Sequence, residues 1–161
     1  MERPTSAVLL MEETVLPGMG KPLMLEAFLA APVLAWMGRR LLTDGVQRLF
    51  LACDVACEAE ARACLPPELA VTLSNRREDL LDFLDTQERV LVLCRSALPL
   101  EGAGAGFAYS CPGRELRETW RERLTNQVPG ASLEEGWLPV YGPETLAELE
   151  TVFRERGIEA F

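Results

Sequence analysis

The feature that most constrains the fold of this chain is an alternation of short apolar runs with segments of helical periodicity. Residues 7–11 and 90–94 are continuously apolar, which is typical of strands buried on both faces of a sheet. We predict four strands, at 7–11, 46–53, 69–73 and 90–94, and three intervening helices, at 32–42, 56–65 and 77–84. A β-α-β-α-β-α-β order with short connections predicts an α/β fold, a three-layer α/β/α Rossmann-like sandwich around a mostly parallel sheet.

Proline and glycine mark the ends of these helices. Pro32 suits the first turn of the helix that it opens, and Gly45 suits the position just after its last turn. The pair Pro66-Pro67 stops the second helix, because proline has no amide hydrogen for the helical ladder.

The C-terminal third has a less regular pattern. We predict a flexible bend at 101–106, a last strand at 107–109, an amphipathic helix at 114–124, a loop at 126–136, an extended segment at 137–141 and a C-terminal helix at 143–157. Trp120 shares an apolar helix face with Leu116 and Leu124, so we expect it in the core rather than stacked on a ligand. The apolar stripe of the C-terminal helix either docks on the sheet or serves a partner, such as a second copy of the chain. Residues 1–161 are expected to form a single domain.

Composition and charge exclude several classes of function. A net charge of −9 argues against nucleic-acid binding, because phosphate backbones are bound by clustered Lys and Arg side chains. No apolar run approaches the ~18 residues that cross a bilayer, and the start of the chain lacks a secretory apolar segment. These observations favour a cytoplasmic location and argue against a membrane partner.

The chain has no histidine and an odd number of cysteines, five. The absence of histidine excludes Ser-His-Asp and Cys-His catalysis. The cysteines lie mostly in apolar segments and lack the paired spacing of a zinc knuckle. We therefore expect buried, reduced thiols and no structural metal site.

Ligands of a parallel α/β sheet bind outside the carboxyl ends of the strands, where the strand order reverses. The candidate site residues are those that follow each strand, namely 12–21, Asp54, 74–77 and Arg95-Ser96. Lys21, the only lysine beside fifteen arginines, lies in a glycine-bearing loop after the first strand. Backbone N–H groups and an ammonium together can bind phosphate, so Gly18, Gly20 and Lys21 are the predicted phosphate ligands, with Arg76 as a further cation. The alternative is an ordinary turn that carries a surface lysine.

This loop is not a P-loop. The fingerprint requires glycine where Val15 stands and serine or threonine where Pro22 stands. A dinucleotide-binding G-x-G-x-x-G pattern is also absent from the sequence.

Several segments resemble the sugar-1-phosphate nucleotidyltransferase family. The residues that carry the resemblance are the strand at 7–11, the loop with Lys21, Ala-Pro-Val-Leu-Ala-Trp at 31–36, Asp-Gly-Val-Gln-Arg-Leu-Phe-Leu at 44–51, and the strand at 90–93 followed by Pro99-Leu100. They are similar to the MobA-like NTP transferases and to the N-terminal uridylyltransferase domain of bacterial bifunctional UDP-N-acetylglucosamine pyrophosphorylase/glucosamine-1-phosphate acetyltransferases. The helix at 145–157 resembles the helix that links that domain to its acetyltransferase half. The resemblance implies a nucleotide-diphospho-sugar transferase fold, a nucleotide or sugar-phosphate ligand and, in an active member, Mg²⁺.

The sequence departs from this family at the positions that carry its chemistry. Glu12 and Glu13 stand where the family has a glycine-rich loop with an arginine, and two carboxylates repel a triphosphate. Ser96 or Ala97 stands at the position of the metal-binding aspartate, and neither side chain is an anionic ligand for Mg²⁺. Residues 74–77 replace the pattern that reads uracil, and the sugar-binding half is missing. The resemblance therefore implies a shortened, degenerate domain with weak or no catalysis.

Three hypotheses follow. The first is a residual nucleotidyltransferase in which Lys21 is the catalytic cation and Glu12 or Glu13 is a displaced metal ligand. The second is a non-catalytic domain that binds a nucleotide or sugar phosphate, or that mediates assembly. The third is an unrelated Rossmann-like domain whose order of strands and helices matches the family by chance.

Overall fold

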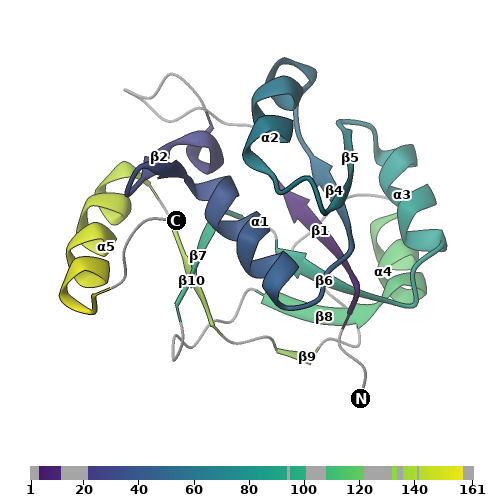
Figure 1. Cartoon of the computed structure of the whole chain (residues 1–161). Coiled ribbons are helices and arrows are strands. Elements are labelled where there is room, and N and C mark those ends of the chain that lie inside the picture. The colour runs from purple at the N-terminus through teal and green to yellow at the C-terminus, as the bar shows by residue number, and fades with distance from the viewer. Residues whose placement is uncertain are drawn as a thin grey trace.

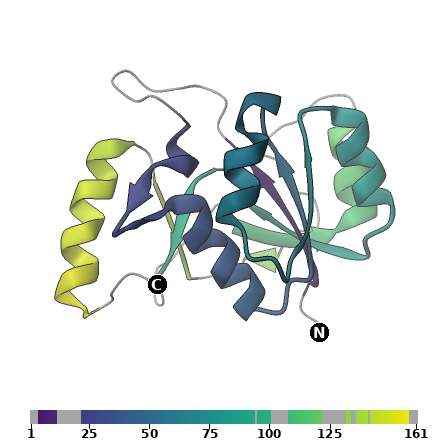
Figure 2. The same ribbon diagram turned by 45° about the horizontal axis from the view of Figure 1, so that its top comes forward.

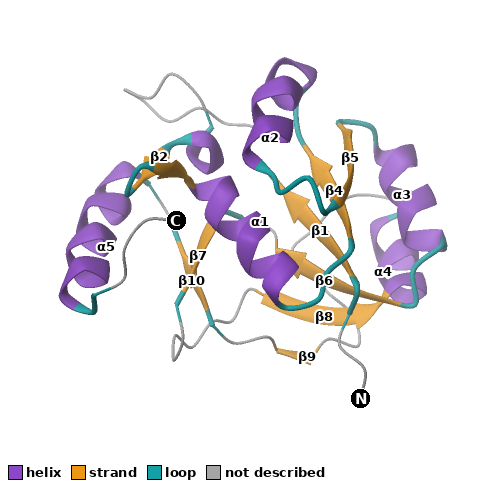
Figure 3. Cartoon of the chain, in the orientation of Figure 1, coloured by secondary structure: helices purple, strands orange, loops and turns teal. Residues whose placement is uncertain are grey.

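The computed structural model describes residues 4–11, 22–93, 95–100, 108–121, 132–133, 136–140 and 142–157, which form a mixed α/β fold (Figures 1 and 3). The helices are η1 (Leu23–Leu25), α1 (Val33–Thr43), η2 (Val55–Cys57), α2 (Glu58–Cys64), α3 (Arg77–Asp85), α4 (Gly113–Trp120) and α5 (Pro143–Glu155), of which η1 and η2 are 3₁₀ turns. The strands are β1 (Ser6–Leu10), β2 (Ala27–Phe28), β3 (Ala31–Pro32), β4 (Arg48–Ala52), β5 (Ala70–Ser74), β6 (Arg89–Leu93), β7 (Ala97–Pro99), β8 (Ala108–Pro112), β9 (Ser132–Leu133) and β10 (Trp137–Pro139).

The main sheet is mostly parallel, as the sequence predicts. Its strand order is β5-β4-β1-β6-β8-β9. The four strands β5, β4, β1 and β6 run parallel, with β1 flanked by β4 and β6. The strand β8 is antiparallel to β6, and β9 is antiparallel to β8. The chain therefore begins in the middle of the sheet, moves to one side through β4 and β5, and then crosses to the other side with β6.

Alternate residues of the buried strands enter two separate apolar clusters. The larger cluster contains Ala7, Leu9, Leu49, Leu51, Leu91 and Leu93 of the sheet, together with residues of α1, α2, α5 and the segment 23–28. The smaller cluster contains Val8, Phe50, Val90, Val92 and Cys111 of the sheet, together with Leu80 and Leu84 of α3 and Leu116 and Trp120 of α4. Trp120 is fully buried, which confirms the prediction that it belongs to the core.

The end of α1 follows the glycine signal in the sequence. Gly45 has a φ of 96°, and its amide donates to the carbonyl of Leu42 at 3.1 Å. The amide of Val46 donates to the carbonyl of Leu41 at 3.0 Å. This pair of hydrogen bonds is a Schellman motif, which pairs carbonyls that the helix itself leaves without a donor.

The sequence analysis did not predict the short hairpin β2–β3. The two strands pair antiparallel through Phe28 and Ala31, so the turn between them consists of Leu29 and Ala30 alone. Both turn residues have positive φ angles, 48° for Leu29 and 72° for Ala30. Two-residue hairpin turns of this kind favour Asn-Gly, and a non-glycine residue in the left-handed region costs about 1–2 kcal/mol. The turn is therefore strained at two consecutive positions.

The helix α5 packs within the chain, beside the β2–β3 hairpin and on the side of the molecule opposite to α3 and α4 (Figure 2). Phe153 is fully buried, and its ring lies 4.9 Å from that of Phe28 and 5.9 Å from that of Trp36, in edge-to-face geometry. Trp36 also donates from its indole nitrogen to the carbonyl of Phe28 at 2.9 Å. The stripe thus docks on the hairpin and on α1 of the same chain, and its role in binding a second copy stays a prediction.

A second, two-stranded sheet lies against α1. Here β7 pairs antiparallel with β10, so that Trp137 faces Pro99. The guanidinium of Arg40, on α1, lies 5.6 Å from the ring of Trp137 and donates to the carbonyl of Gly136 at 3.4 Å. The same guanidinium pairs with Asp44 at 2.9 Å. Arg40 therefore links the C-terminal half of α1 to the start of β10.

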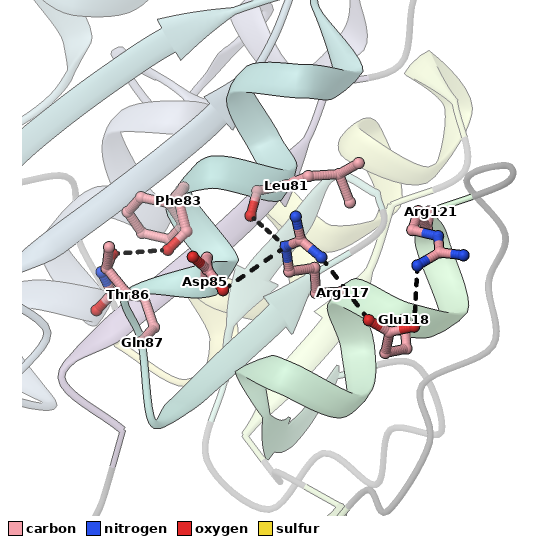
Figure 4. Close-up of polar contacts among 8 residues, drawn as sticks. All are labelled: Leu81, Phe83, Asp85, Thr86, Gln87, Arg117, Glu118 and Arg121. Carbon is pink, nitrogen blue, oxygen red and sulfur yellow. Dashed lines mark hydrogen bonds and ion pairs between the residues drawn. The ribbon is translucent and has the colours of Figure 1, made fainter.

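The helices α3 and α4 are joined by polar contacts at their ends (Figure 4). Arg117 donates to the carbonyl of Leu81 at 3.2 Å and lies 3.9 Å from the carboxylate of Asp85. The amide of Gly113 donates to the carbonyl of Glu88 at 3.0 Å. A Cβ atom on Gly113 would lie 2.3 Å from the carbonyl oxygen of Gln87, so only glycine allows the two segments to approach this closely.

The remaining differences from the predicted elements lie in the C-terminal third. The strand predicted at 107–109 is longer, at Ala108–Pro112, and it is not the last, because β9 and β10 follow it. The segment predicted as a loop at 126–136 contains β9. The bend predicted at 101–106 lies outside the described residues. No helix in the described part of the chain is long and apolar enough to cross a membrane.

Candidate functional site

The strand order places the candidate site between the carboxyl ends of β1 and β6. The chain leaves β1 toward β4 on one side, whereas β6 lies on the other side, so the strand order reverses between these two neighbours. The crevice outside the carboxyl ends at such a reversal is the usual ligand site of open α/β sheets. The segment 12–21, which follows β1, and Arg95 and Ser96, which follow β6, both start at this point.

The predicted phosphate ligands Gly18, Gly20 and Lys21 lie outside the described residues, as do Glu12 and Glu13. The described chain stops at Met11, whose amide donates to the carbonyl of Ala52 at 2.9 Å, and resumes at Pro22. The roles assigned to Lys21 and to the two glycines remain predictions.

After β6, the backbone turns into the second sheet. Ser96 is completely buried, and its carbonyl accepts the amide of Val140 at 3.0 Å. Ala97 is also completely buried. Arg95 is half-buried beside them and is the described cation nearest in sequence to the carboxyl end of β6.

Arg76 lies after β5, at the edge of the sheet. Two strands, β4 and β1, separate β5 from β6, which corresponds to roughly 14 Å at a strand spacing of about 4.8 Å. The guanidinium of Arg76 pairs with Glu78 at 3.2 Å, and its side chain is 68% exposed. The fold therefore places Arg76 away from the reversal point, whereas it brings Arg95 and Ser96 next to the start of the segment that contains Lys21.

The helices that begin at this edge carry their own carboxylates. Glu58 and Glu60 lie in the first turn of α2, and Glu78 and Asp79 lie in the first turn of α3. Carboxylates in a first turn interact favourably with the positive end of the helix dipole, and they compete with an anionic ligand for that position.

Ser74 fixes the turn that leads into α3. Its hydroxyl donates to the carboxylate of Asp79 at 2.6 Å and accepts the amide of Arg76 at 3.0 Å. This hydroxyl and this carboxylate are thus engaged within the turn. Their contacts account for the conformation of 74–79 without a bound ligand.

The thiols near this edge are poor nucleophiles. Burial raises the pKa of Cys53 to about 11, with further contributions from Glu58, Cys57 and Asp54. Burial, followed by Asp54 and Glu60, also raises the pKa of Cys57. Both groups remain protonated thiols at neutral pH, and reactive cysteines have the opposite shift.

The described residues do not fit the Mg²⁺ site that the family resemblance implies. Buried Ser96 and Ala97 occupy the position of the family's aspartate, and neither supplies an anionic oxygen. No group of three or more His, Cys, Asp or Glu side chains converges on a metal position within the described ranges. A chemical step through Mg²⁺ therefore has no basis in these residues.

No family model matches the chain, and no curated protein sequence matches it. The similarity to nucleotidyltransferases thus remains an expectation from the residues quoted above.

Two features of the structure were not predicted from the sequence. The first is the β2–β3 hairpin, because Leu29-Ala30 lacks the Asn-Gly signal of a two-residue turn. The second is the set of carboxylates in the first turns of α2 and α3. The acidic residues that follow Asp54 and Arg77 in the sequence are the signal that could have predicted these carboxylates.

Proposed function

We propose that this chain is a Rossmann-like domain related to the nucleotidyltransferases that binds a nucleotide or sugar phosphate and has weak or no catalytic activity. The observation that carries the proposal is the strand order β5-β4-β1-β6, whose reversal point lies at the start of the segment that contains Lys21. The three-layer arrangement and a cytoplasmic location are parts of the same proposal. The two apolar clusters on opposite faces of the sheet support the first of these.

The chemistry of the described edge argues against catalysis. Nucleotidyl transfer depends on cations and a metal that stabilise the charge of the transition state. The described edge instead presents Asp54 and the first-turn carboxylates of α2 and α3, and it has no anionic side chain at Ser96. We therefore propose that the domain is a pseudoenzyme and that Lys21 is a phosphate contact rather than a catalytic cation.

Magnesium-dependent release of pyrophosphate from UTP and N-acetylglucosamine-1-phosphate tests the catalytic part. We expect no release above that of a protein-free control. Release that is lost in Lys21→Ala and kept in Arg48→Ala would overturn the pseudoenzyme proposal. Arg48 is a suitable control because it is an exposed cation at the amino end of β4, on the opposite edge of the sheet.

Thermal-shift measurements with UTP, UDP-N-acetylglucosamine and inorganic phosphate test the binding part. A ligand that binds only the folded state raises the melting temperature, by an amount that grows with the logarithm of its concentration above Kd. We expect an increase that Lys21→Ala reduces and Arg48→Ala leaves unchanged. The absence of a shift with all three compounds would reject the binding function.

A further inference from the structure

The turn between β2 and β3 is strained, and tertiary contacts hold it in place. Leu29 and Ala30 both have positive φ angles without being glycine or asparagine. Such conformations persist only where the surrounding structure imposes them, and they occur often at switch regions. The contacts that impose this one therefore decide whether the turn is fixed or can change.

One set of contacts comes from α1. The carbonyl of Phe28 accepts the indole N–H of Trp36 at 2.9 Å, and the two rings lie 5.6 Å apart. The amide of Val33 donates to the carbonyl of Glu26 at 2.9 Å. These contacts hold the two strands against the helix that directly follows them in the chain.

The other set comes from α5, whose Phe153 ring also contacts the ring of Trp36. Phe153 places its ring 4.9 Å from the ring of Phe28, nearly perpendicular to it. Glu150 accepts the amide of Leu29, a residue of the turn itself, in a long hydrogen bond of 3.4 Å. The second carboxylate oxygen of Glu150 lies 4.0 Å from the guanidinium of Arg154, one helical turn later. The turn thus receives a ring contact beside it and a backbone hydrogen bond from the same helix.

We propose that α5 is a latch that holds the Leu29–Ala30 turn in its strained conformation, and that the turn relaxes when α5 undocks. A relaxed turn has negative φ angles at both residues, and such turns splay the two strands of a short hairpin. Undocking therefore opens the pairing of Phe28 with Ala31 at the end of the hairpin. The hairpin therefore has two states. The contacts of α5 favour the strained turn, and the strain itself favours the relaxed turn.

Hydrogen exchange and NMR couplings of the ligand-free protein test this proposal, so the outcome is independent of the proposed binding function. In Phe153→Ala we expect Ala30 to lose the couplings and ¹³C shifts of a positive φ, and the amide of Ala31 to exchange about tenfold faster or more. Glu150→Ala, which removes the acceptor of the Leu29 amide, should give a change in the same direction. Glu148→Ala is the matched control, because Glu148 is an exposed carboxylate two residues earlier on α5, and exchange of the Ala31 amide in this variant should stay within about twofold of the wild type.

A second substitution separates strain from a general loss of stability. Glycine adopts positive φ without cost, so Phe153→Ala combined with Ala30→Gly should restore slow exchange at residue 31. Exchange that stays equally fast in the double variant would overturn the proposal. Retention of a positive φ at Ala30 in Phe153→Ala would also overturn it. Should Phe153→Ala fail to fold, Phe153→Leu and Glu150→Ala provide the same readout.

Discussion

The two faces of the sheet are covered in different ways. On the face of the smaller cluster, α3 and α4 lie side by side and are joined by backbone and guanidinium contacts at their ends (Figure 4). On the face of the larger cluster, α1 and α2 are joined by the hairpin, by the β7–β10 pair and by α5, whose contacts are mainly aromatic. The first face depends on close backbone approach, whereas the second depends on a helix that arrives from the far end of the sequence.

This difference indicates which parts of the fold tolerate substitutions. A helix packed by one row of side chains can undock as a unit, because few backbone groups depend on it. A pair of helices joined through glycine and through carbonyl groups loses these hydrogen bonds as well as its apolar contacts when it separates. We therefore expect substitutions on the two faces to lower the unfolding free energy by different amounts and for different physical reasons.

The largest expected effect is that of Phe153→Ala on the larger cluster. Truncation of a fully buried phenylalanine typically costs about 3–5 kcal/mol of unfolding free energy. Chemical denaturation followed by circular dichroism measures this loss. Thr151→Ala, at an exposed position of the same helix, should change stability by less than about 0.5 kcal/mol. A loss below about 1 kcal/mol for Phe153→Ala would show that α5 does not stabilise this face.

Gly113→Ala tests the close approach on the other face. The added methyl group would lie 2.3 Å from the carbonyl oxygen of Gln87 and 3.0 Å from that of Leu84, and both are backbone atoms. Overpacking of this kind costs about 1–3 kcal/mol, and we expect the upper end of that range. Gly45→Ala is the control, because no atom of the described residues lies within 4 Å of its Cβ position and only the positive φ is unfavourable. Equal losses for both variants would contradict the steric explanation.

Alkaline pH should destabilise the larger cluster through Cys53. The pKa of Cys53 is raised from 9.0 to about 11, chiefly by burial, so the folded state keeps the thiol proton after the unfolded state has lost it. The stability that this group contributes is therefore complete below pH 9 and is lost as the pH rises toward 11, by an amount on the order of 2 kcal/mol. The difference between the denaturation midpoints of the wild type and of Cys53→Val should be constant below pH 8, and above pH 9 the wild-type midpoint should fall relative to that of the variant. A constant difference over the whole range would reject this linkage.

The substitution Ala30→Gly should stabilise the protein, by about 1 kcal/mol, because glycine removes the strain of a positive φ. Ala35→Gly, in the interior of α1, should have the opposite effect of similar size. Thermal unfolding of both variants measures the contrast. A destabilised Ala30→Gly would show that the turn carries no strain.

The smallest expected effect is that of Arg117→Ala, a loss of about 0.5–1 kcal/mol. Most of it comes from the hydrogen bond to the carbonyl of Leu81, in the middle of α3. The pair with Asp85 contributes little, because that carboxylate is largely exposed. Arg121→Ala is the control, since Arg121 contacts only the exposed Glu118 among the ion pairs of the described residues. Equal losses of unfolding free energy for Arg117→Ala and Arg121→Ala in urea denaturation would show that the contact with the Leu81 carbonyl contributes nothing to stability.

The sequence was sufficient for the parallel part of the fold. Its strands and helices follow from local signals: apolar runs for β1 and β6, and proline and glycine at the ends of α1 and α2. The positions of β7 and β9 could not be predicted, because these strands are only two or three residues long and form through pairing between distant segments. The strand β10 lies within the extended segment predicted at 137–141. The docking of α5 was left open because an apolar stripe does not reveal its partner.

The candidate site was predictable to a lesser extent. Residues that follow parallel strands meet at one edge whatever their identity, so Arg95 and Ser96 could be placed correctly at the end of β6. The distance of Arg76 from the reversal point depends on the order of the strands in space, which the order along the chain does not determine. The burial of Ser96 likewise depends on the pairing of β7 with β10, which the sequence did not indicate.

The contact between Leu29 and Glu150 spans 121 residues of the chain, and this separation has a consequence for biosynthesis. At 5–20 residues per second, a ribosome needs roughly 6–24 s to make the helix that covers Phe28 and Trp36 after the hairpin has been made. Through that interval the nascent chain exposes an uncovered aromatic surface, whereas α3 and α4 are close enough in sequence to cover their face soon after synthesis. We expect ribosome-bound chains stalled at residue 140 to recruit chaperones that bind apolar segments, and chains extended beyond residue 155 by a linker to release them.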